Sequence, residues 1–211
     1  MKFKKVAFYT LGCKVNQYET ESLKKQFVDN RFETAEFEEY ADIYVVNSCT
    51  VTSIADKKTR NMLRRAKKLN EDSVVIATGC YAQTNGEELS KIEEIDYVVG
   101  NTDKNAIFNL ITKIEREETL PKLIVKNIFD EKIYEEIEFS TLREMSRAYI
   151  KIQDGCNNFC SYCKIPFARG GNRSRKLNSI LEEVETLAKD GFKEIILIGI
   201  NLGAYGEDLE E

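Results

Sequence analysis

The sequence predicts an α/β protein built on a parallel β-sheet with helices on both faces. First, strand-like and helix-like segments alternate along residues 1–118. Second, the strand-like segments are continuous apolar runs, which are typical of strands buried on both faces of a sheet. Third, the segments between them are amphipathic, so each helix has an apolar face that can cover the sheet.

The elements of this region follow from the pattern in order. Apolar and β-branched runs predict strands at 5–10, 42–48, 73–79 and 96–100, with a weaker strand at 32–37. Helical periodicity predicts helices at 16–30, 53–69, 86–92 and 104–114. Residues 1–118 are therefore expected to form one domain.

A second α/β unit is predicted after a charge-rich linker at 119–145, which contains Pro121 and has room for one or two edge strands. This unit, 146–211, has a strand at 147–155, a cysteine-rich loop, a helix at 178–190 closed by Gly191, and a strand at 194–200. We find no internal repeat.

Composition limits the class of protein. The chain has 211 residues, 42% of them hydrophobic, and a net charge of -5, so it can bury a core and gives no global attraction to nucleic acid. No stretch resembles a signal peptide or a membrane span, so we expect a cytoplasmic protein without a membrane partner. Six cysteines would suggest disulfides in a small secreted protein, but this chain is larger and shows no export signal, so we do not expect a disulfide framework.

Three of the cysteines each follow a predicted strand. Cys13 follows "FYTLG", Cys49 follows "IYVVNS" and Cys80 follows "VVIATG". Ligands of open parallel sheets bind outside the carboxyl ends of the strands. We therefore expect these three thiols to meet around one object.

The other three cysteines form one loop. Cys156, Cys160 and Cys163 have C-x3-C-x2-C spacing directly after a strand, so three thiolates can surround one centre. A structural zinc site would need a fourth ligand, and the chain contains no histidine. Two sets of three instead favour two [4Fe-4S] clusters, each with one iron left open.

These segments resemble a known family. The loop with Tyr162 before its last cysteine is similar to that of the radical S-adenosylmethionine (SAM) enzymes. The wider pattern of "LGCKVNQYE", "VNSCTVT", "TGCYAQ" and "IQDGCNNFCSYCKIPFARGGNRSR" resembles the methylthiotransferases. "TLGCKVNQYETE" and "ADKKTRNMLRRA" most resemble the bacterial group that acts on threonylcarbamoyladenosine in tRNA.

The resemblance implies a fold and a chemistry. The fold is a flavodoxin/Rossmann-like methylthiotransferase domain followed by the start of a radical-SAM partial (β/α) barrel. The strand-end trio would hold an auxiliary cluster that carries the inserted sulfur, and the loop trio would hold the cluster that binds SAM. Reductive cleavage of SAM would then yield a radical able to remove hydrogen from C2 of adenosine 37 in the tRNA anticodon loop. Flavodoxin or ferredoxin would supply the electron.

Several further residues are candidates for the site. Tyr162 is expected against the SAM adenine, with loop packing as the alternative, and Gly199 and Asn201 are weaker candidates for SAM contacts. Gly12, Gly79 and Gly155 precede cluster cysteines, where glycine permits tight turns, although strand ends often carry glycine.

Two basic patches are candidates for tRNA phosphates. One lies on the predicted helix 53–69, whose apolar stripe is expected at Ala55, Met62, Ala66 and Leu69. Its basic residues are Lys57, Arg60, Arg64, Lys67 and Lys68, and the alternative is a solvated face. The other comprises Arg169, Arg173, Arg175 and Lys176, which have the alternative of pairing with acidic residues of "ILEEVE".

The sequence also suggests a fragment, because the barrel would stop after its second strand with an unpaired apolar edge at "EIILIGI". Two functional hypotheses follow. The chain is part of a tRNA methylthiotransferase, or it is a cluster-binding module without turnover. A sister enzyme acting on isopentenyladenosine in tRNA or on a ribosomal protein aspartate is the remaining alternative.

Overall fold

The computed structural model describes residues 3–102, 104, 106–137 and 147–209. The elements of the N-terminal region are β1 (Lys5–Thr10), α1 (Lys14–Asp29), β2 (Glu33–Ala35), β3 (Ile43–Ser48), α2 (Ser53–Leu69), β4 (Val74–Gly79), α3 (Cys80–Ser90), β5 (Tyr97–Val99) and α4 (Ala106–Glu115). They are followed by β6 (Leu123–Ile124), η1 (Ile128–Asp130), β7 (Arg147–Lys151), β8 (Gln153–Asp154), α5 (Ile165–Arg169), β9 (Arg173–Ser174), α6 (Leu177–Lys189), β10 (Glu194–Ile198) and η2 (Leu202–Ala204).

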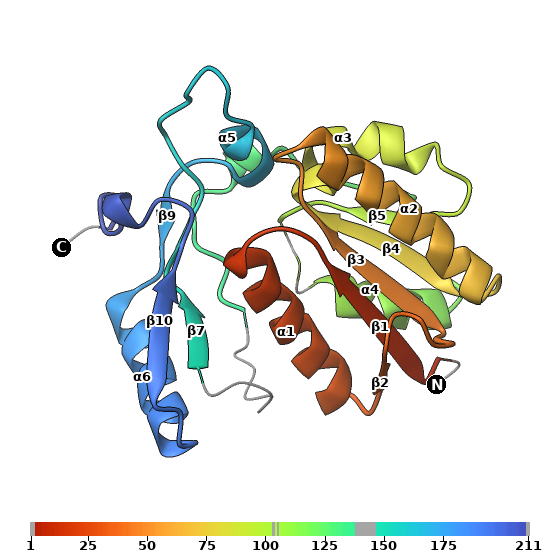
Figure 1. The fold of residues 1–211 in the computed structure, drawn as a ribbon, viewed down its shortest axis with the longest axis horizontal. Helices are drawn as coiled ribbons and strands as arrows, with labels where there is room; N and C mark the ends of the chain where they lie inside the picture. The colour runs from red at the N-terminus through yellow and green to blue at the C-terminus, as the bar shows by residue number, and fades with distance from the viewer. Residues whose placement is uncertain (1–2, 103, 105, 138–146, 210–211) are drawn as a thin grey trace.

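The N-terminal region is a parallel sheet. Within the described residues its strand order is β2-β1-β3-β4-β5-β6, and every neighbouring pair is parallel. The order β2-β1-β3-β4-β5 is that of flavodoxin-like folds, which bind ligands where the order reverses between β1 and β3. The predicted fold class is confirmed, and Figure 1 shows the sheet between its two helical layers.

Each face of this sheet carries its own core. Leu23 and Phe27 of α1 and Ile107 of α4 pack on one face, and Leu63 of α2 and Leu89 of α3 pack on the other. Helices on both faces explain why β3 and β4 are buried at every position.

The buried face of α2 differs from the predicted stripe. Thr59, Leu63 and Ala66 are its buried residues, whereas Met62 packs only at the edge of the core. The helix begins at Ser53 because the Thr52 side chain accepts a hydrogen bond from the Ala55 amide at 3.1 Å. Of the predicted stripe, Ala66 is buried and Met62 and Leu69 pack against the core, whereas the buried Thr59 and Leu63 were not predicted.

The C-terminal region contains one βαβ unit. β7 and β10 pair in parallel, and α6 covers them through a core that includes Ile150, Ile180 and Leu187. The predicted strand 147–155 is divided into β7 and β8, because β8 leaves the sheet and forms a short antiparallel pair with β9.

Helix α1 lies between the two regions (Figure 1). Leu23 and Phe27 face the N-terminal sheet, while Val15 and Tyr18 pack with Ile198 of β10. One helix therefore contributes to two cores, which fixes the βαβ unit against the N-terminal sheet.

Two other details differ from the sequence prediction. The helix expected at 86–92 begins six residues earlier, at Cys80, with a kink at Asn85. Helix α5, which follows the cysteine loop, was not predicted. Strand β6 lies in the expected linker, where the sequence left room for an edge strand, and it extends the N-terminal sheet. Linker residues 138–145 lie outside the described residues.

Replacing Phe27 by alanine should reduce the free energy of unfolding by about 3–5 kcal/mol, because its fully buried ring packs against Phe8, Phe32 and Phe108. Val28→Ala is the matched control, since Val28 is 40% exposed and should cost about 0.5 kcal/mol or less. Urea unfolding of the metal-free proteins measures both. Equal losses would contradict the assigned core.

Candidate functional site

The three strand-end cysteines lie at one edge of the N-terminal sheet. Cys13 follows β1 and is the N-cap of α1, Cys49 follows β3, and Cys80 follows β4 as the first residue of α3. The strand order reverses between β1 and β3, and Cys13 and Cys49 follow these two strands.

Glycine shapes two of the turns that carry these cysteines. Gly12 has a φ of 116°, and a Cβ there would lie 3.3 Å from Cys49 Sγ. Gly79 has a φ of 93° and a ψ of -164°, a conformation that is essentially restricted to glycine. A Cβ at Gly79 would also collide with the Asn47 side chain.

One cavity of about 430 Å³ brings the three thiols together. Its wall also includes Ile165 and Arg169 from the cysteine-loop side and residues 197–200 and 202 from the end of β10 and the turn after it. The space is much larger than a single ion requires, since one water occupies roughly 30 Å³. The geometry therefore unites residues from both regions of the chain around the first cysteine trio.

The three thiols of this cavity suit a metal centre with sulfur ligands. Burial raises the pKa of the Cys49 thiol, and the nearby Cys80 and Cys13 raise it further. The raised pKa favours the neutral thiol, and a bound metal would instead favour the thiolate because it stabilises the negative charge on sulfur. An all-sulfur donor set selects soft metals and iron–sulfur clusters. The residues present thus fit an iron–sulfur group.

Among the described residues, no three Cys, Asp or Glu side chains are arranged to hold a single metal ion. A cluster with three cysteine ligands does not require that arrangement, because each thiolate binds a different iron and the sulfurs lie farther apart. The six cysteines, all of them described, carry free thiols.

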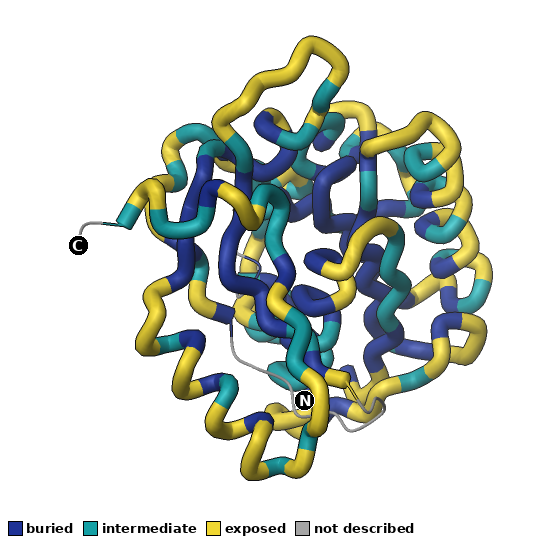
Figure 2. The backbone as a smooth tube through the Cα atoms, turned by 60° about the vertical axis from the view of Figure 1, so that its left-hand side comes forward, coloured by how far each residue is buried: buried dark blue, intermediate teal, exposed yellow. Residues whose placement is uncertain are grey.

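The second trio occupies the loop between β8 and α5. Cys160 is exposed, and Cys156 and Cys163 are partly buried. The loop is tied to α5 by the hydrogen bond from the Cys156 amide to the Gly170 carbonyl, at 3.0 Å. Figure 2 shows it as an exposed projection next to α5, which leaves its thiols accessible to a ligand.

Of the three predicted SAM-site residues, Tyr162 and Asn201 lie in or beside this loop, whereas Gly199 lines the first cavity. Tyr162 is 88% exposed, which does not fit the alternative of loop packing. Asn201 Nδ2 lies 3.8 Å from Cys156 Sγ. A Cβ on Gly199 would crowd Gln153, whose Oε1 accepts hydrogen bonds from the amides of residues 200 and 201. Gln153 was not predicted, because nothing in its local sequence marks it.

A buried ion network behind the first cavity was also missed. Glu19 of α1 accepts hydrogen bonds from Lys104, from Lys151 at 2.9 Å and from Arg169 at 2.9 Å. Although burial disfavours the charged carboxylate, the three cations hold the pKa of Glu19 well below its usual range. Asp154 pairs with Lys151 and Arg169, at 2.7 Å and 3.0 Å, and completes the network.

The arginine patch predicted to contact phosphate is not on the surface. Arg169, Arg173 and Arg175 are only 1%, 6% and 5% exposed. Arg175 pairs with Glu183 of α6, which is the alternative that the sequence left open, while Arg169 pairs with Glu19 and Asp154. A phosphate cannot reach these guanidinium groups without displacing their partners.

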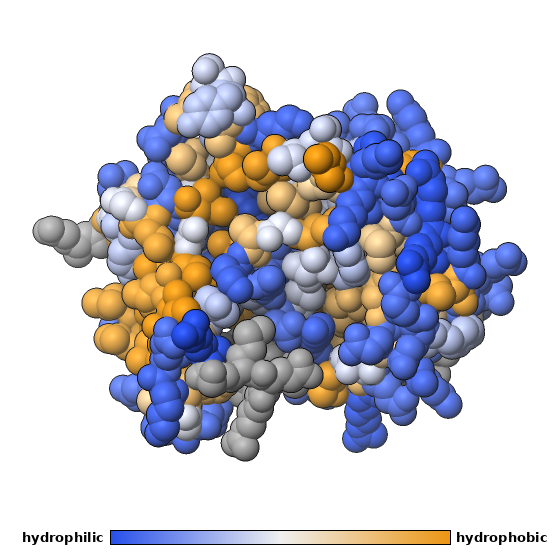
Figure 3. All heavy atoms as spheres, viewed as in Figure 1, coloured by the Kyte–Doolittle hydropathy of each residue, from blue (hydrophilic) through white to orange (hydrophobic). Residues whose placement is uncertain are grey.

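The outer face of the basic helix α2 is hydrophilic, as Figure 3 shows. Lys57, Arg64 and Lys68 are exposed, and Arg60 is partly buried. Arg60 and Arg64 have carboxylate partners in Glu88 and Glu94, at 3.5 Å and 3.7 Å. An exposed pair such as Arg64–Glu94 contributes little to stability, so Arg64 can exchange partners, whereas Arg60 also donates to the Tyr81 hydroxyl.

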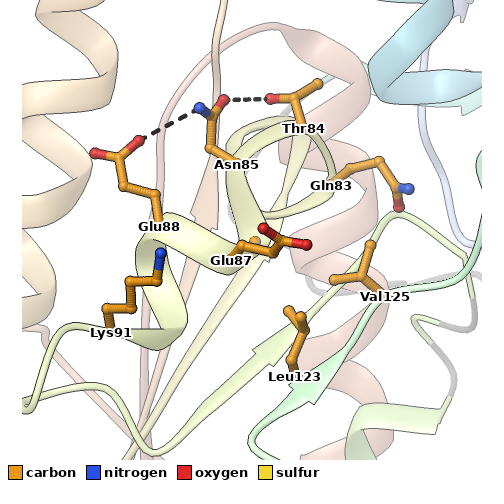
Figure 4. Close-up of a pocket in the computed structure, with 9 residues that line it drawn as sticks. Gln83, Thr84, Asn85, Glu87, Glu88, Lys91, Leu123 and Val125 are labelled. Atoms are coloured by element: carbon orange, nitrogen blue, oxygen red, sulfur yellow. Dashed lines mark hydrogen bonds between the residues drawn. The ribbon is translucent and has the colours of Figure 1, made fainter.

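A second cavity, of about 540 Å³, lies along α3 and contains none of the six cysteines. Figure 4 shows the side chains of Gln83, Asn85, Glu87 and Glu88 around it. Its lining lacks a convergent set of metal donors. In the described part of the chain, no helix has the length and apolar character that a membrane span requires.

Comparison with known families gives two matches. Residues 5–100 match Uncharacterized protein family UPF0004, and residues 150–211 match the Radical SAM superfamily. The boundary between the two matches falls between the two regions of the fold.

Individual relatives are similar over nearly the whole chain. The threonylcarbamoyladenosine tRNA methylthiotransferases MtaB of Bacillus subtilis and Aquifex aeolicus are 46% and 45% identical, over 98% and 97% of this chain and 46% and 50% of their own. The tRNA-2-methylthio-N(6)-dimethylallyladenosine synthase of Fusobacterium nucleatum is 36% identical, over 98% of this chain and 48% of its own. The chain spans about half the length of these curated relatives.

Replacing Gly79 by alanine should displace Cys80, because the new Cβ combines a strained φ with a collision at Asn47. Gly191→Ala is the control, since Gly191 has a similar φ of 90° with no atom within 4 Å and should cost about 1–2 kcal/mol. Gly79→Ala should cost more and should expose the buried Cys80 thiol. Urea unfolding and thiol-reagent kinetics measure these effects, and indistinguishable variants would contradict the turn's role.

Proposed function

This chain belongs to the radical SAM methylthiotransferase family, and from that premise we propose that it supplies both cluster sites of a tRNA-modifying enzyme. The reaction we propose converts N6-threonylcarbamoyladenosine at position 37 to its 2-methylthio derivative. The observation that carries the proposal is the division of six cysteines into two groups of three, one at the sheet edge and one in the exposed loop.

Cys13, Cys49 and Cys80 would hold the auxiliary [4Fe-4S] cluster. The proposal is supported by the cavity that all three line and by the absence of histidine from the chain. Three cysteine ligands leave one iron open, and that position would accept the sulfur to be inserted. Leu197, Ile198 and Ile200 give one wall of the cavity apolar side chains.

Cys156, Cys160 and Cys163 would hold the second [4Fe-4S] cluster, at which SAM binds. That cofactor supplies a radical able to remove hydrogen from an unactivated carbon. The exposed ring of Tyr162 is available to stack on an adenine, and Asn201 is held beside Cys156. An electron donor such as flavodoxin or ferredoxin would reach this exposed loop.

The proposed tRNA contact is the outer face of α2. Lys57, Arg60, Arg64 and Lys68 lie on the helix that follows Cys49, so phosphates bound there would place the anticodon loop near the first cavity. Arg169, Arg173 and Arg175 do not belong to this surface. A tRNA substrate also implies the cytoplasm, and we retain the division into 1–118, 119–145 and 146–211 as the proposed domains.

Two alternatives concern substrate and turnover. A sister activity on isopentenyladenosine is less favoured, because the relative named for dimethylallyladenosine is less similar than the two named for threonylcarbamoyladenosine. An aspartate of a ribosomal protein is the other sister substrate. The chain by itself could also bind clusters without turnover, since it spans about half the length of its relatives.

Cluster content and tRNA modification test the proposal. Anaerobically reconstituted chain should contain about eight irons, and about four when Cys13, Cys49 and Cys80 are all replaced by alanine. Expression of the full-length protein in a bacterium lacking this activity should add methylthio-threonylcarbamoyladenosine, measured by mass spectrometry of tRNA nucleosides. The triple variant should add none.

Two outcomes would count against the proposal. About four irons in the unmodified chain would contradict the two-cluster division. Methylthiolated isopentenyladenosine with unmodified threonylcarbamoyladenosine would assign the sister substrate.

A further inference from the structure

The buried ion network behind the first cavity carries an excess of positive charge. Within the described residues its two carboxylates, Glu19 and Asp154, face three fully buried cationic groups, which are Lys104, Lys151 and Arg169. Arg173 lies 3.7 Å from Asp154 but also lines a small cavity with Glu131 and Glu135, so it is left out of this balance. Charges removed from water are costly unless they are compensated, so an excess inside the protein favours a nearby anion.

Arg169 is the cation of this network that lines the first cavity. It lines the cavity with the three cysteines and is 1% exposed. Its Nη1 donates to Glu19 and Asp154, and its Nη2 donates to Asn16 Oδ1 at 2.7 Å. Its Nε is buried and has no hydrogen-bond partner among the described residues. A buried donor without an acceptor is costly, so a ligand that reached Nε from the cavity would relieve this cost.

Two asparagines connect this arginine to the cysteines. Asn16 Oδ1, which accepts from Arg169, also lies 3.7 Å from Cys13 Sγ. Asn101 Nδ2 lies 3.6 Å from Cys80 Sγ and donates to the carbonyl of Ala168 at 2.7 Å. The position of the guanidinium is thus fixed relative to two of the three sulfurs.

The charge of Arg169 is stable in this setting. Burial opposes the protonated form, but Asp154, Glu19 and Cys80 together hold the pKa of Arg169 well above its usual value. Cys80 therefore experiences Arg169 as a fixed cation. A neighbouring sulfur anion in the same cavity would experience the same attraction.

We propose that Arg169 is a positioning residue that holds a sulfur anion, of the hydrosulfide or thiolate class, in the cavity lined by Cys13, Cys49 and Cys80. The inference rests on the proposed function. It gives Arg169 a role different from the contact with tRNA phosphate that the sequence predicted. The unpaired Nε donates to the anion, and the excess charge of the network supplies the attraction. The pairs to Glu19 and Asp154 keep the guanidinium in place.

The test measures anion binding by one cluster. The full chain is reconstituted anaerobically with Cys156, Cys160 and Cys163 replaced by alanine, so that only the first site reports. Hydrosulfide, and separately the neutral ligand imidazole, are titrated while the reduced cluster is followed by electron paramagnetic resonance. Arg169→Met should weaken hydrosulfide binding by about tenfold or more and imidazole binding by about twofold or less.

Arg175→Met is the matched control. Arg175 is also a buried, ion-paired arginine of the C-terminal region, but its partners are Glu136 and Glu183 and it does not line the cavity. Its loss should leave hydrosulfide binding within about twofold of the unmodified chain. The midpoint potential should fall in Arg169→Met, because a nearby cation favours the reduced cluster, and should stay unchanged in Arg175→Met.

Each outcome has one meaning. An iron-loaded Arg169→Met protein that binds hydrosulfide as the parent does would overturn this inference and leave the proposed function intact. A parent chain without iron would overturn the proposed function itself.

If the Arg169→Met protein does not load iron, the Arg169→Lys protein is used to test the anion-holding role, because lysine retains the positive charge. A loaded lysine variant should recover most of the hydrosulfide affinity. A loaded lysine variant without that affinity, or failure of both variants to load iron, would contradict the anion-holding role.

Discussion

Glu19 is a carboxylate in the middle of a helix that is buried on two sides, and three cations from different segments converge on it. Lys104 comes from the N-terminal region, and Lys151 and Arg169 come from the C-terminal region. A buried carboxylate without such partners would be strongly destabilising. The network therefore closes only when the βαβ unit is docked on α1, and this requirement couples the two regions.

The location of the cysteines follows from this docking and from strand order. The flavodoxin-like order brings Cys13, Cys49 and Cys80 to the edge where β1 and β3 diverge. Docking then adds Arg169 and the end of β10 as the opposite wall. The first cavity thus lies between the two regions of the chain, although all three of its cysteines belong to the N-terminal region. Hydrophobic contact between Val15, Tyr18 and Ile198 supports the same arrangement.

Much of this could be predicted from local sequence. Continuous apolar runs identified β1, β3 and β4, and their ends located the three cysteines without any structural information. The helix after β4 was placed six residues too late, because Gly79 and Gly86 made Cys80–Asn85 look like a loop. The short helix α5 and the β8–β9 pair have too few residues to produce a periodic signal.

Long-range charge pairing could not be predicted in this way. Glu19 looks like a surface residue among its polar neighbours, and Arg169, Arg173 and Arg175 look like a phosphate-binding patch. Arg175 pairs with Glu183, eight residues away and within the acidic segment that the sequence offered, whereas Arg169 and Glu19 are 150 residues apart. The most direct test of the coupling is a double-mutant cycle of Glu19→Gln and Arg169→Met in urea unfolding. The account predicts an interaction energy above about 1 kcal/mol, whereas additive effects within about 0.3 kcal/mol would contradict it.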